Sequence, residues 1–309
     1  MIIDNDMLRA IRILGFVGIV SAFCVSCGSG SESNVPDTSP PVEIPEEMDI
    51  STSDRVQFQR AKIVLFSLPS PMETAKILKK SGAIYDTKYL SPTENVKKHE
   101  TSKGKAIAMG IYIADLSYAN VFKQQQACMD YFSVINEIAN EISLSEVFTK
   151  DLIERVDAHI SNEDSVLKFL TESYWKANME LKEDDRESVA GLLAAGGWIE
   201  GVYIASHLVN PNNKPDVVKE RIAEQGATLK QLIKFLSSFK DDKNLLDVIL
   251  DLERLEKLFN QIDVEIVRIE GTVDESGTAV VGKKKTYIFK EGLMEEIIKT
   301  THEIRNKYA

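Results

Sequence analysis

The sequence predicts an all-α fold: a multi-helix body, orthogonal or bundle-like, with one short hairpin or irregular insert near residues 264–290. Two observations predict this fold class. Most of the chain beyond residue 54 places apolar residues three and four positions apart, which is the period of an amphipathic helix. β-Branched residues and glycine turn signals gather in a single stretch, Val264 to Phe289. With 309 residues, 43% of them hydrophobic, the chain is long enough to bury a sizeable core.

The charge balance excludes several classes of function. The chain carries 37 Lys and Arg against 48 Asp and Glu, which gives a formal net charge of −11. Nucleic acid and anionic lipid headgroups would be repelled by such a chain, so neither is expected as a main partner. Ordinary hydrophobic and charged fractions also exclude wholesale disorder and a polytopic membrane protein.

Residues 1–26 are predicted to form a signal peptide. Two arginines precede a 13-residue apolar run, Ile13 to Val25. That run is too short to span a bilayer core, which needs about 20 residues, but it suits a secretory signal. Met7 would give a more ordinary amino-terminal region than Met1, so the true start codon stays open between them.

The apolar run ends in Cys24-Val25-Ser26-Cys27. This motif resembles the lipobox of bacterial lipoproteins, in which small residues precede a cysteine that becomes the lipidated amino terminus. The resemblance implies that Cys27 carries acyl chains such as palmitate and that Cys24 is removed; a plain cleaved signal and a buried structural cysteine are the alternatives. Several acyl chains give a stable anchor, here at the bacterial outer membrane, with the periplasmic or cell-surface face left open. Only Cys128 then remains, so the mature chain forms no intrachain disulfide.

Residues 27–53 are predicted to be the lipidated cysteine and a disordered acidic tether. Between Gly28 and Ile50 the chain has six acidic residues and no basic one, so this stretch supplies −6 of the net −11. Such a segment buries too little apolar area to offset the entropy of ordering, and like charges extend it. A spacer without further meaning and an export-sorting role of the acids are both compatible with this composition. A single helical domain, 54–309, follows.

Start and stop signals divide that domain into helices. Ser70 as N-cap, Pro71 at the first helical position and Glu73 two positions later predict a helix that ends at Gly82. Apolar periodicity, acidic or asparagine caps and prolines place the remaining helices at 105–122, 124–142, 162–182, 184 or 185 to 209, 217–239, 244–262 and 291–308. The first of these, 105–122, is apolar on nearly all sides and is therefore expected in the core.

Two of the helices share a short repeat. Gly110–Ala114 matches Gly201–Ala205 in four of its five residues at an offset of 91, and each helix also presents small residues at four-residue spacing. Glycine inside a helix costs about 1 kcal/mol relative to alanine, so its presence indicates a close approach of two backbones. We therefore predict that the two helices pack closely at Gly110, Gly197 and Gly201; an old duplication is a further interpretation.

Polar residues on these two helices form a candidate polar pocket. Its members are Asp115, Tyr118, Glu200, Tyr203 and His207. A buried acid must find a hydrogen-bond donor or raise its pKa. The pocket would bind a small ligand or a metal; the alternative is that Asp115 and Glu200 are satisfied internally. Residues 189–209 are long enough to span a membrane, but Glu200 at the midpoint favours burial in protein.

Catalytic and metal-binding motifs are scarce. HExxH, CxxC, the P-loop, GxGxxG after a strand and GxSxG are all absent from the sequence. The four histidines are scattered, and His302-Glu303 lacks the second histidine of a zinc-protease helix, so a solvated helix face is expected there. No cofactor, no metal site and no catalytic residue is predicted.

Three segments resemble an uncharacterised family of all-helical lipoproteins from Bacteroidetes-type bacteria. They are Ser67–Glu73, Gly110–Ala119 and Gly196–Gly201. The resemblance implies an all-α lipoprotein that faces the periplasm or the cell surface, and it implies no activity. We therefore expect a lipid-anchored cell-envelope protein that binds an unknown protein or small-molecule partner. The alternatives are an enzyme that uses Asp115, Glu200 and His207 between the two central helices, and a purely structural envelope component.

Overall fold

The computed structural model describes residues 79, 84–147, 149–159, 162, 165, 169, 173, 176–177, 180–181, 186–209, 217–239, 242–273 and 279–309. All of them belong to one unit of the chain, Ile50–Ala309. The predicted signal peptide, Cys27 and the tether lie outside these residues. So does the helix predicted from Ser70 to Gly82, apart from Lys79, which is helical.

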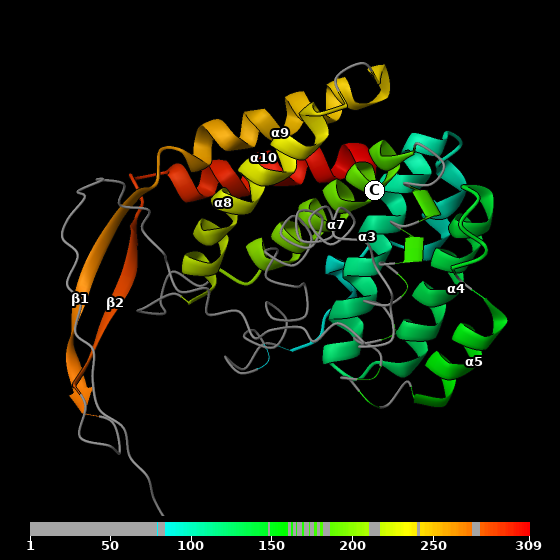
Figure 1. Ribbon diagram of the computed structural model, residues 1–309, viewed down its shortest axis with the longest axis horizontal. Coiled ribbons are helices and arrows are strands. Elements are labelled where there is room, and N and C mark those ends of the chain that lie inside the picture. The colour runs from blue at the N-terminus through cyan, green and yellow to red at the C-terminus, as the bar shows by residue number, and fades with distance from the viewer. Residues whose placement is uncertain are drawn as a thin grey trace, which may run out of the picture. The chain divides into compact units, whose positions relative to one another are not determined.

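The fold is all-α apart from one two-stranded sheet in the described part of the chain, which confirms the predicted fold class (Figure 1). In chain order the elements are η1 (Thr87–Tyr89), η2 (Thr93–Lys98), α3 (Ser102–Val121), α4 (Gln125–Glu141), α5 (Lys150–His159), α7 (Glu187–Ser206), α8 (Val217–Ser237), η3 (Lys243–Leu245), α9 (Leu246–Phe259), β1 (Asp263–Val273), β2 (Ala279–Ile288) and α10 (Leu293–Tyr308). The two short 3-10 helices η1 and η2 and the helix α5 have no counterpart among the predicted elements.

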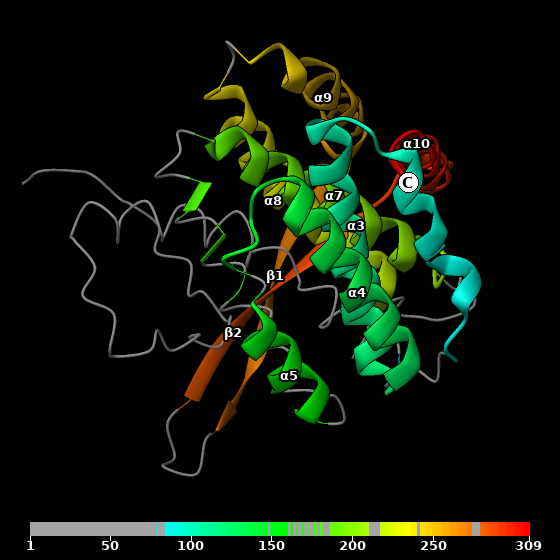
Figure 2. The same cartoon turned by 90° about the vertical axis from the view of Figure 1, so that its right-hand side faces the viewer.

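Helices α3 and α7 form the centre of the fold. They pack against each other; α4 covers the other side of α3, while α8 and α10 pack on α7, and α9 lies over α8 and α10 (Figures 1 and 2). The largest fully buried side chains include Trp198 on α7 and Tyr112 and Tyr118 on α3. A helix with apolar residues on nearly all sides has no face suited to water, and this explains why these two helices take the central positions.

The crossing of α3 and α7 brings two backbones into contact at glycines. A Cβ atom at Gly110 would lie 2.0 Å from the carbonyl oxygen of Leu193, and a Cβ at Gly196 would lie 2.0 Å from the carbonyl oxygen of Ile107. A Cβ at Gly197 would lie 3.4 Å from the carbonyl oxygen of Gly110, which is ordinary contact. Gly196, which the sequence did not single out, is therefore one of the two positions where no side chain fits.

Gly201 lies one turn beyond this crossing and is half-buried. Helix starts differ from their predicted positions because capping groups lie elsewhere: Thr101 Oγ1 accepts the amide hydrogen of Gly104, so α3 begins at Ser102. At the predicted cap Asn162, the side-chain oxygen accepts the amide hydrogen of Ser165 at 3.0 Å.

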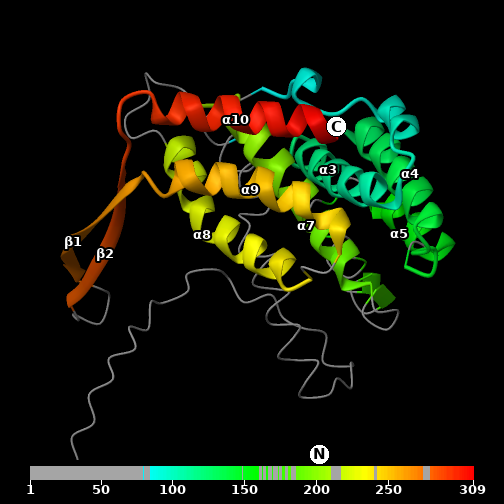
Figure 3. The same cartoon turned by 90° about the horizontal axis from the view of Figure 1, so that it is seen from above.

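The β-branched stretch forms the hairpin β1–β2, the first of the two alternatives that the sequence left open. Val264 pairs with Tyr287 and Ile266 with Lys285, and the register shifts between Ile269 and Thr272. The hairpin connects α9 to α10 and extends away from the helices (Figures 1 and 3).

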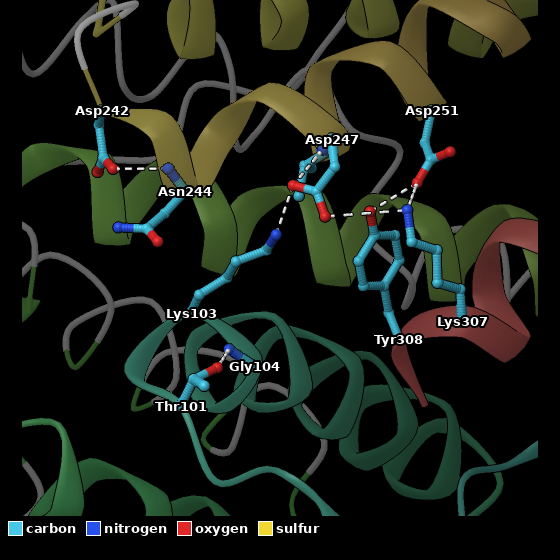
Figure 4. A network of polar contacts seen from close by, with 10 residues as sticks. Thr101, Lys103, Gly104, Asp242, Asn244, Asp247, Asp251, Lys307 and Tyr308 are labelled. Carbon is cyan, nitrogen blue, oxygen red and sulfur yellow. Dashed lines mark hydrogen bonds and ion pairs between the residues drawn. The ribbon is translucent and has the colours of Figure 1, made fainter.

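Ion pairs at the surface join α9 to α3 and α10 (Figure 4). Lys103 on α3 pairs with Asp247 on α9. The ammonium of Lys307 and the hydroxyl of Tyr308, both on α10, donate to Asp251 on α9, each at 2.6 Å. Partial burial would raise the pKa of Asp247, but the hydrogen bond from Lys103 and the nearby positive charges hold it below its usual value.

One described helix is long and apolar enough to cross a membrane by length and composition, and it is α7, over Ser188–Ser206. Most of that stretch is buried inside the protein, between α3, α8 and α10. The core helix of a soluble protein meets the same criteria, and burial against three other helices is the position of a core helix.

Candidate functional site

A buried ion pair lies where α7 meets α10. Glu200 on α7 is 0% exposed and Arg305 on α10 is 8% exposed. Arg305 donates from Nε to one carboxylate oxygen of Glu200 at 2.9 Å and from Nη2 to the other at 3.0 Å. This two-bond geometry is the strongest that a guanidinium and a carboxylate can form, and it fixes both side chains.

Ser91 connects that pair to Asp115. The backbone amide of Ser91 donates to Oδ2 of Asp115 on α3 at 3.1 Å, and its hydroxyl accepts from Arg305 Nη2 at 3.0 Å. The hydroxyl of Tyr131 on α4 donates to the Ser91 carbonyl oxygen at 2.9 Å, and Tyr112 donates to the carbonyl oxygen of Pro92 at 3.2 Å. A segment without regular α-helix is therefore bound to three helices by polar contacts.

The two buried carboxyl groups of Asp115 and Glu200 interact electrostatically. Asp115 is 0% exposed, and its Oδ1 has no hydrogen-bond donor among the described residues as long as both carboxyl groups are ionised. Burial and the negative charge of Glu200 raise the pKa of Asp115 well above its usual value, although the Ser91 amide and Arg305 oppose the shift. A protonated Asp115 donates to Glu200, and the group of three side chains is then electrically neutral.

Glu200 is the carboxyl group that is bonded directly to Arg305. Burial raises the pKa of Glu200 above its usual value too, although the hydrogen bonds and positive charge of Arg305, and a hydrogen bond from Asp115, oppose the shift. We call Asp115, Glu200, Arg305 and Ser91 the buried polar network.

Four rings, Tyr89, Tyr203, His207 and His302, form a second group, the ring cluster. His207 and His302 stack with ring centroids 4.7 Å apart and planes 15° apart. Tyr89 on η1 packs against His207 at 4.5 Å, and Tyr203 packs against both imidazoles, at 4.5 and 4.7 Å. All four side chains are half-buried. The cluster thus joins η1, the end of α7 and α10 at the surface.

Hydrogen bonds fix which imidazole nitrogens carry the proton. The carbonyl oxygen of Tyr203 lies 2.9 Å from His207 Nδ1 and accepts the Ser206 hydroxyl hydrogen at 2.6 Å. Since a carbonyl only accepts, His207 Nδ1 is protonated. Ser206 has one hydrogen, so it accepts from His302 Nε2, 2.8 Å away. Nε2 of His207 and Nδ1 of His302 are left with lone pairs that have no partner among the described residues.

Both histidines are neutral near pH 7. Partial burial lowers the pKa of His207, and the positive charges of Arg305 and Lys88 lower it further. Burial, His207 and Arg305 lower the pKa of His302. Arg305 also links the two groups of residues, because its guanidinium lies 4.4 Å from the centre of the Tyr203 ring while it donates to Glu200.

The structure thus places four of the five candidate pocket residues in two adjoining groups. Asp115 and Glu200 lie in the buried polar network, and Tyr203 and His207 in the ring cluster. Tyr118 lies apart: its ring stacks on Tyr85 at 5.5 Å and packs against Phe122 at 4.9 Å. Its hydroxyl has no hydrogen-bond partner in the described part of the protein.

Sequence reasoning missed Arg305, Ser91 and His302. The prediction of a solvated face at His302 is wrong, because the ring is half-buried against His207. A signal for Arg305 was available: it lies eight positions after Ile297, on the apolar face of α10, where an unpaired charge would be costly. Ser91 carries no such signal, because its neighbours form no periodic pattern.

The described residues contain no group of three or more His, Cys, Asp or Glu side chains that could hold a metal ion. Comparison with protein families, with curated proteins and with solved structures finds no match to this chain. The resemblance of three segments to helical lipoproteins therefore stays a prediction.

Proposed function

We propose that this protein is a lipid-anchored component of the bacterial cell envelope whose helical domain binds a small molecule or a protein partner at the ring cluster. The observation that carries the binding function is the pair of stacked imidazoles, His207 and His302. Each has one nitrogen fixed inside the protein and one lone pair without a partner among the described residues. The rings are half-buried and packed against one another, so in the closed protein little side-chain freedom remains to be lost on binding.

Membrane attachment by lipid rests on the motif that ends in Cys27. The one described helix apolar enough to span a bilayer, α7, is enclosed by other helices and is therefore not proposed as the anchor. Lipid attached at the amino terminus, followed by an acidic tether, would hold the domain away from a negatively charged membrane surface.

Binding is favoured over catalysis by the state of the acidic groups. Asp115 and Glu200 are both 0% exposed, and the charge of Glu200 is already neutralised by Arg305. Ser206 lies beside His302 as a nucleophile would, but it is 6% exposed and its hydrogen is donated to the Tyr203 carbonyl. The enzyme alternative would require these groups to be uncovered first.

Lipidation is tested with the matched variants Cys27→Ala and Cys24→Ala. Cells are labelled with an alkyne analogue of palmitate, and the protein is followed by label and by membrane fractionation. We expect Cys27→Ala to lose the label and leave the membrane fraction, while Cys24→Ala keeps both. Label that persists in Cys27→Ala would contradict the anchor. Protease shaving of intact cells then distinguishes a cell-surface from a periplasmic face.

Binding is tested by native mass spectrometry of the full-length protein extracted from its own cells in mild detergent. His207→Asn and His302→Gln replace the nitrogens that donate inside the protein and remove the free lone pairs. His159→Asn is the control, since His159 Nδ1 also lies 2.9 Å from the carbonyl oxygen four residues earlier but is exposed on α5. A bound species present in the wild type and the control, and absent from both variants, would support the site. Its absence from the wild type would favour a purely structural envelope component.

A further inference from the structure

Residues 84–99, which we call the strap, cover the buried polar network. The strap contains the two 3-10 helices η1 and η2, whose hydrogen bonds are weaker than those of an α-helix. Figures 2 and 3 show it in cyan beside the carboxyl-terminal part of α10, where Arg305 donates to Ser91.

Little apolar surface holds the strap in place. Leu90 and Val96 are its buried apolar side chains, at 5% and 7% exposure, while Ile84 is 83% exposed. The rest of its attachment consists of ring and polar contacts. Tyr85 stacks on Tyr118 and Tyr89 packs on His207, while the Ser91 amide and hydroxyl bond to Asp115 and Arg305, and the carbonyl oxygens of Ser91 and Pro92 accept from Tyr131 and Tyr112. A segment with few buried apolar contacts has a low free energy of local opening.

We propose that the strap is a proton-operated latch: protonation of His207 and His302 releases Tyr89 and Ser91 and opens the buried polar network to solvent. Insofar as the latch regulates the binding site, this inference rests on the proposed function. Opening of the strap is nevertheless measured without a ligand. An experiment can therefore contradict the latch and leave the binding site supported, or the reverse.

The charges around the two histidines favour opening of the strap when the histidines are protonated. From α10, Arg305 faces both rings; from η1, Lys88 faces His207. Asp86 on the strap is the opposing charge at His207, and it is already paired with Lys88 at the surface. Tyr203 and Ser206 contribute neutral groups from α7.

Protonation would place two imidazolium cations in stacked rings whose centroids are 4.7 Å apart, next to the cation of Arg305. No carboxylate in the described residues hydrogen-bonds either ring, so the repulsion is relieved when Tyr89 leaves His207 and water enters. Ser91 lies two residues beyond Tyr89, and its loss removes contacts to both Asp115 and Arg305.

The Asp115–Glu200 pair does not resist the opening. Burial and the charge of Glu200 raise the pKa of Asp115 well above its usual value, so acidification favours the neutral form of Asp115 and creates no new ion pair between the strap and the buried polar network. Its contacts with the strap are then hydrogen bonds to a neutral acid and to Arg305, with no ion pair between strap and network in the described part of the chain.

The test is hydrogen–deuterium exchange of the full-length protein followed by mass spectrometry, from about pH 7.5 down to about pH 5, the range in which histidine titrates. The exchange rates are first corrected for the intrinsic pH dependence of exchange. We then expect the protection of residues 84–99 to fall about tenfold for each unit by which closing the strap lowers the pKa of His207 or His302. Protection of α3 and α7 should stay constant.

Variants that do not titrate separate the latch from other effects. His207→Asn and His302→Gln keep the donated hydrogen bonds, so each should remove part of the pH response and together they should abolish it. His159→Asn should leave the response unchanged. His99, at the end of η2, also has a pKa lowered by burial and by Lys98, so His99→Gln is a second control.

Four outcomes overturn the proposal: a strap whose protection does not change with pH, an equal response in the double variant, a response that only His99→Gln removes, and loss of protection over α3 and α7 at the same pH as the strap. The pH profile of the wild type alone shows whether the strap responds to pH and whether α3 and α7 lose protection with it. The latch can therefore be disproved even if the double variant does not fold.

Discussion

Arg305 donates two hydrogen bonds to Glu200, one to each carboxylate oxygen, across 105 positions of the chain. Both residues are buried, and Ser91 and Asp115 complete the hydrogen bonding around them. The acid that the sequence placed in the middle of an apolar helix is thus balanced by a base in the last helix of the chain.

Removing the charge of Glu200 should cost more than any surface substitution. Glu200→Gln removes the carboxylate to which buried Arg305 is directly bonded, and we expect a loss of about 3–5 kcal/mol in the free energy of unfolding, measured in urea. In the double variant Glu200→Leu with Arg305→Met the buried charge is absent, and most of the loss should be recovered. A double variant no more stable than Glu200→Gln would contradict this account of the pair.

Asp115→Asn should be tolerated, in contrast to Glu200→Gln. Asparagine donates to Glu200 and accepts from Ser91 as protonated Asp115 does, and it takes up no proton on folding. Because the pKa of folded Asp115 is raised above the unfolded value of 3.8, its contribution to stability is full below that value and is lost as the pH rises towards the folded pKa. The free energy of unfolding of Asp115→Asn should therefore equal or exceed that of the wild type near pH 7. As the pH falls, the wild type should gain stability relative to the variant.

Urea unfolding at several pH values measures this difference. Asp130→Asn, at an exposed position of α4, is the matched acid-to-amide control. A loss of more than about 1 kcal/mol near pH 7 in Asp115→Asn would mean that Asp115 is ionised in the folded protein.

The helix crossing should distinguish three neighbouring glycines. At Gly110 and Gly196 an added methyl group meets a backbone carbonyl oxygen at 2.0 Å, and a backbone in a packed core cannot move aside. We expect Gly110→Ala and Gly196→Ala to destabilise by about 3 kcal/mol or more. Gly197→Ala meets its nearest atom at 3.4 Å and gains up to about 1 kcal/mol of helix propensity, so its stability should stay near wild type. Equal thermal stability of all three variants would contradict the crossing.

The ion pair between Lys103 and Asp247 should contribute little. Both side chains reach solvent, so Asp247→Asn should cost less than about 1 kcal/mol, and the loss should shrink in high salt. Because the folded pKa of Asp247 is lowered, its contribution is present above the unfolded value and is lost as the pH falls through the folded one. A large, salt-independent loss measured by urea unfolding would show a stronger link between α3 and α9.

Much of the fold could be predicted from local pattern. Residues 105–122 lack a polar face, so they had to be buried, and Gly110 among them indicated a partner helix whose backbone comes close. The stretch from Val264 was compatible with a hairpin and with an ordered loop, because β-branched residues favour strands while glycines favour turns and loops. The start of α3 could not be fixed, since Thr101 caps it through side-chain geometry that the pattern does not contain. Asp242 likewise caps the 3-10 helix η3, which precedes α9 and was not predicted as a separate element.

By itself the sequence determined that Glu200 lies inside the protein, because its neighbours on every side of the helix are apolar. Which group neutralises it was decided only by tertiary structure. Arg305 reaches Glu200 because α10 returns across α7, and Ser91 reaches Arg305 and Asp115 because the strap crosses the same junction. Periodicity describes one helix at a time, whereas an ion pair between residues 105 positions apart depends on how separate elements pack against each other.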